Sequence, residues 1–273
     1  MSRHQGYKSL PSDTADHIPS LVTEPIALPP LTIPRPELVN ELIKRVECFR
    51  IVRVDAPSVS GKTTMMNLLI NTLLEWRKTM PIHTLTGWNR TDVESAGGWK
   101  WHLAQKTGQH GDNWLQHPAY LLIDDAQETY WDEELWSGFF NNVNFASSSC
   151  IVLFTSFCLP DSGSSGLFER KSTAVPMALS PAQQISFCAG YHVITSPWTP
   201  IGLQLSQSEA EALVLTHASP FTFLSEGLKI SIFQDSNGHI GALITMVHTI
   251  LQGAVHCPES PYDSDSLPPT FSS

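Results

Sequence analysis

Few cysteines are present, and none of them is arranged as a metal or redox motif. The five lie at positions 48, 150, 158, 188 and 257 and form no C-x-x-C pair. Their spacing argues against a structural zinc site, and their odd number argues against a disulfide framework. Most of them sit inside apolar runs, which predicts reduced, buried thiols in an intracellular, cytoplasmic protein.

Positive charge is also scarce, and long apolar runs are absent. The formal net charge is -10 at pH 7, and no run of Lys and Arg occurs. Such a surface repels a polyanion, so nucleic-acid binding is not expected. The N-terminus lacks the charged and apolar regions of a signal peptide, and apolar runs such as IVLF (151–154) are too short to cross a bilayer. The sequence therefore predicts a soluble protein without a membrane partner.

The composition of the chain divides it into four parts. Residues 1–32 and 258–273 are rich in Pro and Ser and show no sustained periodicity, which predicts two disordered tails. Residues 33–180 are expected to form an α/β domain, and 181–257 a small helical lid. The first helix of the α/β domain is predicted in PELVNELIKRVECF (36–49), where apolar residues recur at helical spacing.

A phosphate-binding motif follows the first predicted strand, IVRVD (51–55). The stretch DAPSVSGKTTMMNLL (55–69) fits G-x-x-x-x-G-K-[ST] at every defining position except the first, where Ala56 replaces glycine. A helix is predicted from residue 63 to about 77. A loop between a strand and a helix N-terminus is the setting in which such a motif binds phosphate, because the helix N–H groups there lack partners.

Each residue type of the motif has a predicted role. Lys62 would neutralise the β- and γ-phosphates of a nucleotide, the hydroxyl of Thr63 would bind Mg²⁺, and Thr64 could reach the α-phosphate. Ala56 is acceptable only if its φ is negative. The alternative is a Ser/Gly-rich turn that happens to precede a helix. The candidate nucleotide-binding residues of this segment are Ala56, Pro57, Ser58, Val59, Ser60, Gly61, Lys62, Thr63 and Thr64.

Two carboxylates end a second apolar strand in AYLLIDDAQ (119–127). Parallel strands deliver their C-terminal residues to one edge of the sheet, so Asp124 can meet the magnesium ion near Thr63. Asp125 is the candidate general base that polarises the attacking water. The alternative for Asp125 is a helix N-cap or a solvated turn residue.

Further strands are predicted at 81–88, 150–156 and 172–179, with a helix at about 93–105. One strand thus separates the phosphate motif from the acidic strand, as in the ASCE class of P-loop proteins. Thr155, at the end of CIVLFTS, could sense the γ-phosphate or hold water together with Ser156; the alternative is an ordinary strand-end hydroxyl. Arg170, in the loop 158–171, could act on a phosphate or simply be solvated.

Beyond residue 180 the pattern becomes helical, over 205–218, 221–233 and 241–252. Ser206 and Glu209 form a predicted capping box at the first of these helices. His239, before the third helix, either caps that helix or faces nucleotide. The eight tryptophans are scattered along the chain, which predicts packing roles and not a base-stacking platform.

These motifs together resemble the STAND-type P-loop ATPases, and most closely the ATPase module of fungal and oomycete crinkler-related proteins. The resemblance rests on seven pieces between about residues 33 and 252: IPRPELVNELI, DAPSVSGKTT, LTGWN, YLLIDDAQETY, IVLFTSF, IGLQLSQSEAEALV and NGHIGAL. It implies that Arg35, with Ile33 and Pro34, lies at the adenine. It also implies that NGHIGAL, which contains His239, occupies the place of a nucleotide-sensing turn.

The sequence departs from that family at several positions. Ala56 replaces glycine, Asp125 stands where many members have Glu, Phe157 replaces an arginine, and NGHIGAL lacks a proline. The shorter Asp125 side chain is compatible with binding and slower hydrolysis.

The predicted fold is therefore an ASCE-type parallel-sheet P-loop domain of about five strands, followed by a small helical domain. The predicted function is to bind ATP and Mg²⁺, to hydrolyse ATP slowly, and to couple nucleotide state to conformation, to assembly with itself or to a protein partner. A non-hydrolysing nucleotide-binding scaffold is the alternative, and a small-molecule kinase a weaker one. The absence of an N-K-x-D motif favours adenine over guanine.

Overall fold

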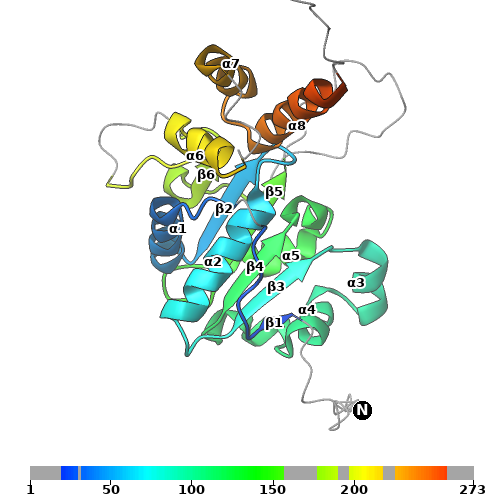
Figure 1. Cartoon of the computed structure of the whole chain (residues 1–273). Coiled ribbons are helices and arrows are strands. Elements are labelled where there is room, and N and C mark those ends of the chain that lie inside the picture. The colour runs from blue at the N-terminus through cyan, green and yellow to red at the C-terminus, as the bar shows by residue number, and fades with distance from the viewer. Residues whose placement is uncertain (1–19, 30–31, 157–176, 190–196, 218–224, 257–273) are drawn as a thin grey trace, which may run out of the picture. The chain divides into compact units, whose positions relative to one another are not determined.

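The computed structural model describes residues 20–29, 32–156, 177–189, 197–217 and 225–256 (Figure 1). The described residues fall into two compact units, one within Met1–Gln204 and the other within Leu205–Ser273. Phe157, Arg170 and the predicted tail at 258–273 lie outside the described residues. No described helix is both long enough and apolar enough to traverse a lipid bilayer.

The first unit is a mixed α/β structure built on one six-stranded sheet. The strands lie in the order β1-β3-β4-β5-β2-β6, and all neighbours are parallel except β1 and β3. The bounds are β1 Leu21–Val22, β2 Ile51–Ala56, β3 Ile82–Thr86, β4 Tyr120–Asp124, β5 Cys150–Ser156 and β6 Gln184–Ser186. One strand, β5, lies between β2 and β4 in the sheet, whereas the run at 81–88, which separates the two motifs along the chain, contains β3 and lies on the other side of β4.

Helices cover both faces of this sheet (Figure 1). α1 (Pro36–Phe49) and α2 (Lys62–Trp76) bury leucines, valines and methionines against one face. α3 (Arg90–Ala96), α4 (Trp99–Thr107) and α5 (Glu133–Gly138) belong to the core of the other face. Four short 3₁₀ helices complete this unit: η1 Gly111–Gln116, η2 Ala126–Thr129, η3 Phe140–Asn142 and η4 Pro181–Gln183.

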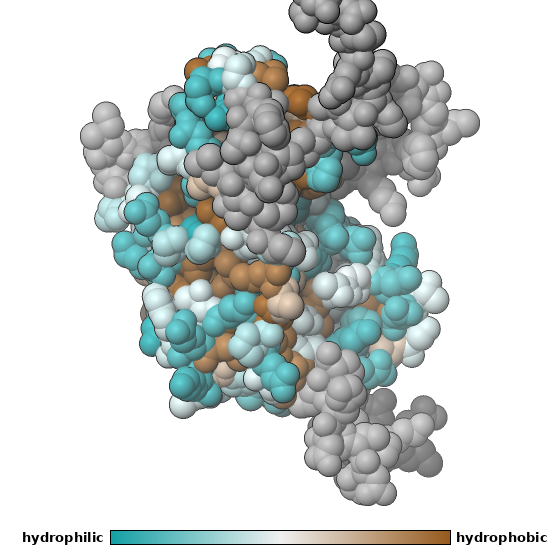
Figure 2. All heavy atoms as spheres, in the orientation of Figure 1, coloured by the Kyte–Doolittle hydropathy of each residue, from teal (hydrophilic) through white to brown (hydrophobic). Residues whose placement is uncertain are grey.

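Side-chain alternation along the strands assigns residues to one face or the other. In β2, Val52, Val54 and Ala56 belong to the core that contains α1 and α2, whereas Ile51 belongs to the other core. Four buried tryptophans, Trp88, Trp99, Trp114 and Trp136, also belong to that second core, which agrees with the packing role expected from the sequence. Hydrophilic residues cover most of the face in Figure 2, with apolar ones showing between them, as on ordinary protein surfaces.

Three sequence expectations about local structure are corrected. The predicted fifth strand at 172–179 is not found in its described part: Met177–Leu179 form no strand, and the sixth strand of the sheet is β6 at Gln184–Ser186. The helix predicted at 93–105 is two helices, because Gly97 and Gly98 adopt φ of 93° and 103° and interrupt it. Cys48 and Cys188 are exposed and only Cys150 is buried among the described cysteines, all of which are unpaired.

Ordered structure also begins earlier than residue 33. β1, at Leu21–Val22, pairs with β3, and Asn71 on α2 exchanges two hydrogen bonds with the backbone of Ile26. Buried apolar contacts made by Ile26 and Leu28 add to the first core. The segment 20–29 is therefore part of the sheet unit.

The second unit contains α6 (Gln207–His217), α7 (Glu226–Ser236) and α8 (Ile240–His256). The predicted capping box is present: the amide of Ser206 donates to the Glu209 carboxylate, and the amide of Glu209 donates to the Ser206 hydroxyl. Ser225 caps α7 in the same manner by accepting from the amide of Leu228.

Candidate functional site

The predicted phosphate loop connects the end of β2 to the start of α2. Ala56 is the last residue of β2, fully buried, and its φ is not positive. The condition under which alanine can replace glycine at this position is therefore met. Positive φ values occur instead at Val59 (59°) and Gly61 (90°).

Alternating backbone handedness turns the loop into a concave shape. When residues with negative and positive φ alternate, successive N–H groups point toward a common centre, and such nests bind anions. The first helical hydrogen bond of α2 runs from Met65 N to Gly61 O, so the amides of Lys62, Thr63 and Thr64 precede the bonding of the helix itself. The positive φ of Val59 is strained, because its side chain is β-branched. Packing does not offset this strain, since Val59 is 74% exposed.

Lys62, the first residue of α2, folds back over this loop. Its Nζ donates to the carbonyl oxygens of Ala56 (3.2 Å) and Pro57 (2.8 Å), and the residue is 6% exposed. Burial lowers the pKa of Lys62, and the carboxylates of Asp125, Asp124 and Asp55 oppose this without reversing it. The Lys62 ammonium is therefore buried at the loop, and its hydrogen-bond partners are two backbone carbonyls.

Thr63 and Asp124 meet directly although 61 residues separate them. The Thr63 hydroxyl donates to Asp124 Oδ2 at 2.8 Å, while Asp124 Oδ1 accepts from the amide of Asp125 at 3.1 Å. Asp124 ends β4 and is buried, and Thr63 lies in the first turn of α2. The hydroxyl and the carboxylate that the sequence predicted as magnesium ligands are thus neighbours.

Asp125 follows Asp124 in a left-handed conformation, with φ 49° and ψ 42°. Its carboxylate is exposed, and Oδ1 accepts from Gln127 Nε2 at 3.0 Å and lies 3.5 Å from Ser156 Oγ. Gln127 also accepts a 2.8 Å hydrogen bond from the amide of Ser156 through Oε1. Gln127 was not predicted as a site residue, because a single glutamine carries no periodicity or motif spacing in the sequence.

Thr155 is not brought to the Thr63–Asp124 pair. It is paired in register with Asp55, and its buried hydroxyl donates to Asp55 Oδ1 at 2.9 Å. Arg53 forms an ion pair with the same Asp55 carboxylate at 3.5 Å, and burial raises the pKa of the adjacent Tyr130. Ser156, one residue later, is the strand-end hydroxyl that reaches Asp125, since alternation places it on the opposite face from Thr155.

Ser60 carries a polar atom without a protein partner. The residue is 4% exposed, and its Oγ is buried with no hydrogen-bonding group in reach. Buried hydroxyls without partners are uncommon in folded proteins. The remaining loop residues are more accessible: Pro57 and Thr64 are half-buried, and Ser58 is exposed.

Two further predicted residues, Arg35 and His239, form hydrogen bonds with backbone groups. Arg35 precedes α1 with φ 47°, and its guanidinium donates to the carbonyls of Gly202, Leu203 and Gln204. His239 belongs to the second unit, where its Nδ1 accepts from the amide of Ala242 at 3.2 Å at the start of α8. This is the capping arrangement considered for His239 from the sequence.

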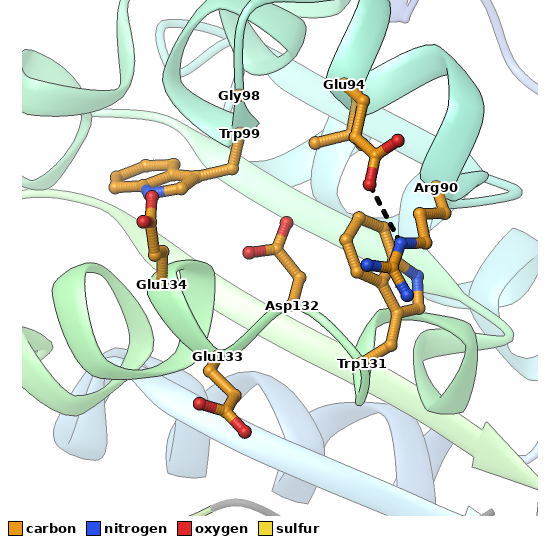
Figure 3. A pocket seen from close by; sticks show the side chains of 9 residues that line it. Arg90, Glu94, Gly98, Trp99, Trp131, Asp132, Glu133 and Glu134 are labelled. Atoms are coloured by element: carbon orange, nitrogen blue, oxygen red, sulfur yellow. Dashed lines mark hydrogen bonds and ion pairs between the residues drawn. The ribbon is translucent and has the colours of Figure 1, made fainter.

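A pocket of about 380 Å³ lies apart from the phosphate loop, and no loop residue lines it (Figure 3). Glu94, Asp132, Glu133 and Glu134 line it, and its one arginine, Arg90, is paired with Glu94 at 2.8 Å. Carboxylates repel phosphate groups, so this pocket does not suit a nucleoside triphosphate.

No protein-family model matches the chain, and no curated protein matches it. Among solved structures, the chain is similar to one described as the structure of Rhizobiales Trip13, with 14% sequence identity and a TM-score of 0.34. The match covers 74% of this chain and 68% of that one. A likeness of this size carries no argument about function.

Proposed function

We propose that this chain is a P-loop nucleotide switch that binds ATP with Mg²⁺ at the loop Ala56–Thr64 and hydrolyses it slowly. The observation that carries the proposal is the 2.8 Å contact between Thr63 Oγ1 and Asp124 Oδ2, next to a loop of alternating backbone handedness. A turn that merely preceded a helix would not require a carboxylate 61 residues away to meet its hydroxyl.

The donor set fits Mg²⁺. Oxygen ligands about 2.0–2.1 Å from an octahedral ion lie about 2.9 Å apart at adjacent corners. The Thr63 and Asp124 oxygens, 2.8 Å apart, have that separation. No cluster of three or more His, Cys, Asp or Glu that could hold a metal occurs among the described residues. This agrees with Mg²⁺ sites that use one or two protein ligands and complete their shell with phosphate and water.

Lys62 and the loop fit the triphosphate. The two carbonyls that now accept from Lys62 Nζ are neutral, and phosphate oxygens would form stronger, charge-assisted hydrogen bonds with the same ammonium. The unpartnered Ser60 hydroxyl supplies a further polar group in the loop. When bound, ATP·Mg²⁺ supplies the reactive phosphoryl group, and Asp125 would accept a proton from water at its carboxylate.

The proposal extends to the rest of the chain. The two units of the fold replace the boundaries expected from sequence, 33–180 and 181–257, because β1 and β6 both belong to the sheet. By the proposal, the unit within Met1–Gln204 binds nucleotide, and the helical unit within Leu205–Ser273 is a lid whose conformation follows nucleotide state. The switch would act through self-association or a protein partner. Arg35 would contribute at the adenine, and His239 at the lid.

A nucleotide titration tests the proposal. The purified chain is titrated with a fluorescent ATP analogue with and without Mg²⁺, beside Asp124→Asn and a control, Asp112→Asn, which changes the same residue type in η1. Mg²⁺ should tighten binding to the wild type and to the control about tenfold or more, and should have no such effect on Asp124→Asn. Equal Mg²⁺ dependence in all three proteins would rule out the assigned metal ligand.

Turnover separates hydrolysis from binding alone. We expect phosphate release from ATP by the wild type, and its loss in Lys62→Ala and Asp125→Ala. Binding without turnover in the wild type would support the non-hydrolysing scaffold, and transfer of phosphate to a small acceptor would support a kinase. Failure of the wild type to bind any nucleotide would remove the proposal.

A further inference from the structure

The direction of the Asp125 carboxylate has to be fixed by a neighbouring residue, because the Asp125 side chain is exposed to solvent. Asp125 follows the last strand residue in a left-handed conformation. An exposed carboxylate can adopt several rotamers. A contact that fixes the Asp125 rotamer therefore fixes the direction in which its carboxylate points.

Gln127 supplies two hydrogen bonds of defined direction at this point. The amide N–H of Ser156 can only donate, so Gln127 Oε1 must face it, at 2.8 Å. The Nε2 group is then turned toward Asp125 and donates to Oδ1 at 3.0 Å. The orientation of the Gln127 amide, and with it the direction of the Asp125 carboxylate, is thereby set by the end of β5.

The segment that carries Gln127 is itself held in place. It belongs to η2, whose last residue Thr129 is fully buried. The Thr129 hydroxyl donates to Ala126 O at 2.7 Å, and Trp136 Nε1 donates to Thr129 Oγ1 at 3.1 Å. A side chain placed on such a segment can hold a neighbour more accurately than one on an unsupported loop.

We propose that Gln127 is a positioning residue that locks the Asp125 carboxylate between the end of β5 and the phosphate loop. Its catalytic consequence rests on the proposed function, because Asp125 is the group it would orient toward water at the terminal phosphate. Gln127 itself does not touch the reacting atoms. The proposal requires that Gln127 affect turnover and the rotamer of Asp125 much more than nucleotide affinity.

The first test compares turnover with affinity. Gln127→Glu keeps an acceptor for the Ser156 amide but replaces the donor to Asp125 with a second carboxylate. We expect kcat for ATP to fall at least tenfold, while KM and the affinity for the fluorescent ATP analogue change less than threefold. Gln116→Glu is the matched control, since it makes the same change in η1, which precedes the N-terminal end of β4, and should leave kcat unchanged. A wild-type kcat in Gln127→Glu would overturn the proposal while leaving the nucleotide site intact.

The second test needs neither nucleotide nor turnover. Asp125 Oδ1 accepts from Gln127 Nε2, and Gln127 Oε1 accepts from the amide of Ser156. Gln127→Met keeps the length of the side chain but removes both hydrogen bonds, so the Asp125 side chain should exchange between rotamers. NMR side-chain couplings of Asp125, with Asp125→Asn to assign the resonances, measure this change, and Gln116→Met is the control. Unchanged Asp125 couplings in Gln127→Met would overturn the positioning role.

The two tests separate the two proposals. If the wild type binds no nucleotide, the proposed function fails, and the side-chain couplings of Asp125 still decide whether Gln127 positions it. If Gln127→Met does not fold, as judged by its thermal melt, the near-isosteric Gln127→Glu keeps the kinetic test decisive.

Discussion

The two ends of the strands of the central sheet both contain interacting polar groups, but the groups differ in their partners. At the end where the strands begin, Tyr120 donates to Glu47 at 2.9 Å, and Arg77 binds the same carboxylate through two nitrogens. Ser20 bonds to His83 at 3.0 Å in the same region. These contacts join segments 30 to 73 residues apart.

At the other end of the strands, the polar groups are held under strain or with weaker partners. Val59 and Asp125 have positive φ, Lys62 is bonded to neutral carbonyls, and Ser60 Oγ has no partner. Positive φ and unpartnered buried atoms are not confined to that end: Arg50, just before β2, has φ 65° and an unpartnered Nε, and Ser149 Oγ, just before β5, also lacks a partner. The second end differs in its loop of alternating φ and in the Lys62 ammonium bonded to neutral carbonyls, an arrangement that can bind an anion. Substitutions at the first end should therefore change stability, and those at the second should change binding.

The largest expected effect comes from Lys62→Met, which keeps most of the aliphatic stem and removes the charge. Loss of charge-assisted hydrogen bonds to phosphate should weaken ATP binding by a hundredfold or more, or about 3 kcal/mol. The free protein should melt at the same or a higher temperature, because a buried ammonium is removed. The exposed Lys78→Met, near the opposite end of the strands, is the control and should leave affinity unchanged. A large loss of stability in Lys62→Met would contradict the assignment of this end of the sheet to binding.

The pH dependence of Lys62 has a defined sign. Its folded-state pKa lies below the ordinary value of 10.5, so between these values the unfolded chain binds the extra proton. The free energy of unfolding contributed by Lys62 therefore rises with pH in that window. Chemical denaturation at pH 8 and pH 10 should show this rise in the wild type and a smaller one in Lys62→Met.

A second stability effect belongs to His83 at the end where the strands begin. Burial lowers the pKa of His83 to about 4, and nearby His117 adds to this. Between pH 6.5 and that value the unfolded chain binds the proton, so stability contributed by neutral His83 is lost as pH falls. From pH 6.5 to 4.5 the loss should be about 2 kcal/mol. Urea denaturation of His83→Gln should lack this component, whereas the exposed His248→Gln should retain it.

A smaller effect is expected from Tyr120→Phe. The substitution leaves Glu47 paired with Arg77 but removes one partly buried hydrogen bond, which should cost about 1 kcal/mol and lower the melting temperature by about 2–4 °C. ATP affinity should equal that of the wild type. A change in affinity without a change in melting temperature would contradict the assignment of this end of the sheet to stability.

The smallest effect should be a gain in stability from Val59→Gly. Glycine adopts positive φ without strain, and the exposed valine side chain contributes little packing. Relief of strain should outweigh the entropy cost by about 0.5–1 kcal/mol, which raises the melting temperature by roughly 2 °C. Val59→Ala retains a Cβ and should show no gain. Calorimetry on the three proteins measures the difference.

Much of the site follows from sequence because it depends on local rules. The phosphate motif, the strand before it and the acidic strand are each short patterns, and the parallel arrangement brings Thr63 and Asp124 together. Strand alternation alone could also have separated Thr155 from Ser156, since neighbouring strand residues face opposite sides of a sheet. By that rule Thr155 and Ser156 cannot both face the γ-phosphate, although the sequence prediction grouped them.

Other features depend on tertiary context that no short pattern records. β6 has three residues, Gln184–Ser186, too few for a periodicity to be seen, and it exists because it pairs with β2. Gln127 acts through the amide of Ser156, 29 positions later in the chain. Its role depends on how two loops meet, which only the assembled sheet defines.

The position of β2 in the sheet affects how the chain folds while it is being synthesised on the ribosome. Its neighbours in the sheet are β5 and β6, and Ile51 pairs with Ile151, whose codon is read 100 residues later. At about 5–20 residues per second, roughly 5–20 seconds pass before that partner is made. During this interval the backbone N–H and C=O groups on both sides of β2 have no partner strand. The nascent chain therefore exposes an unpaired apolar strand of the kind that chaperones bind. Translation speed between these two strands should therefore influence the yield of folded protein.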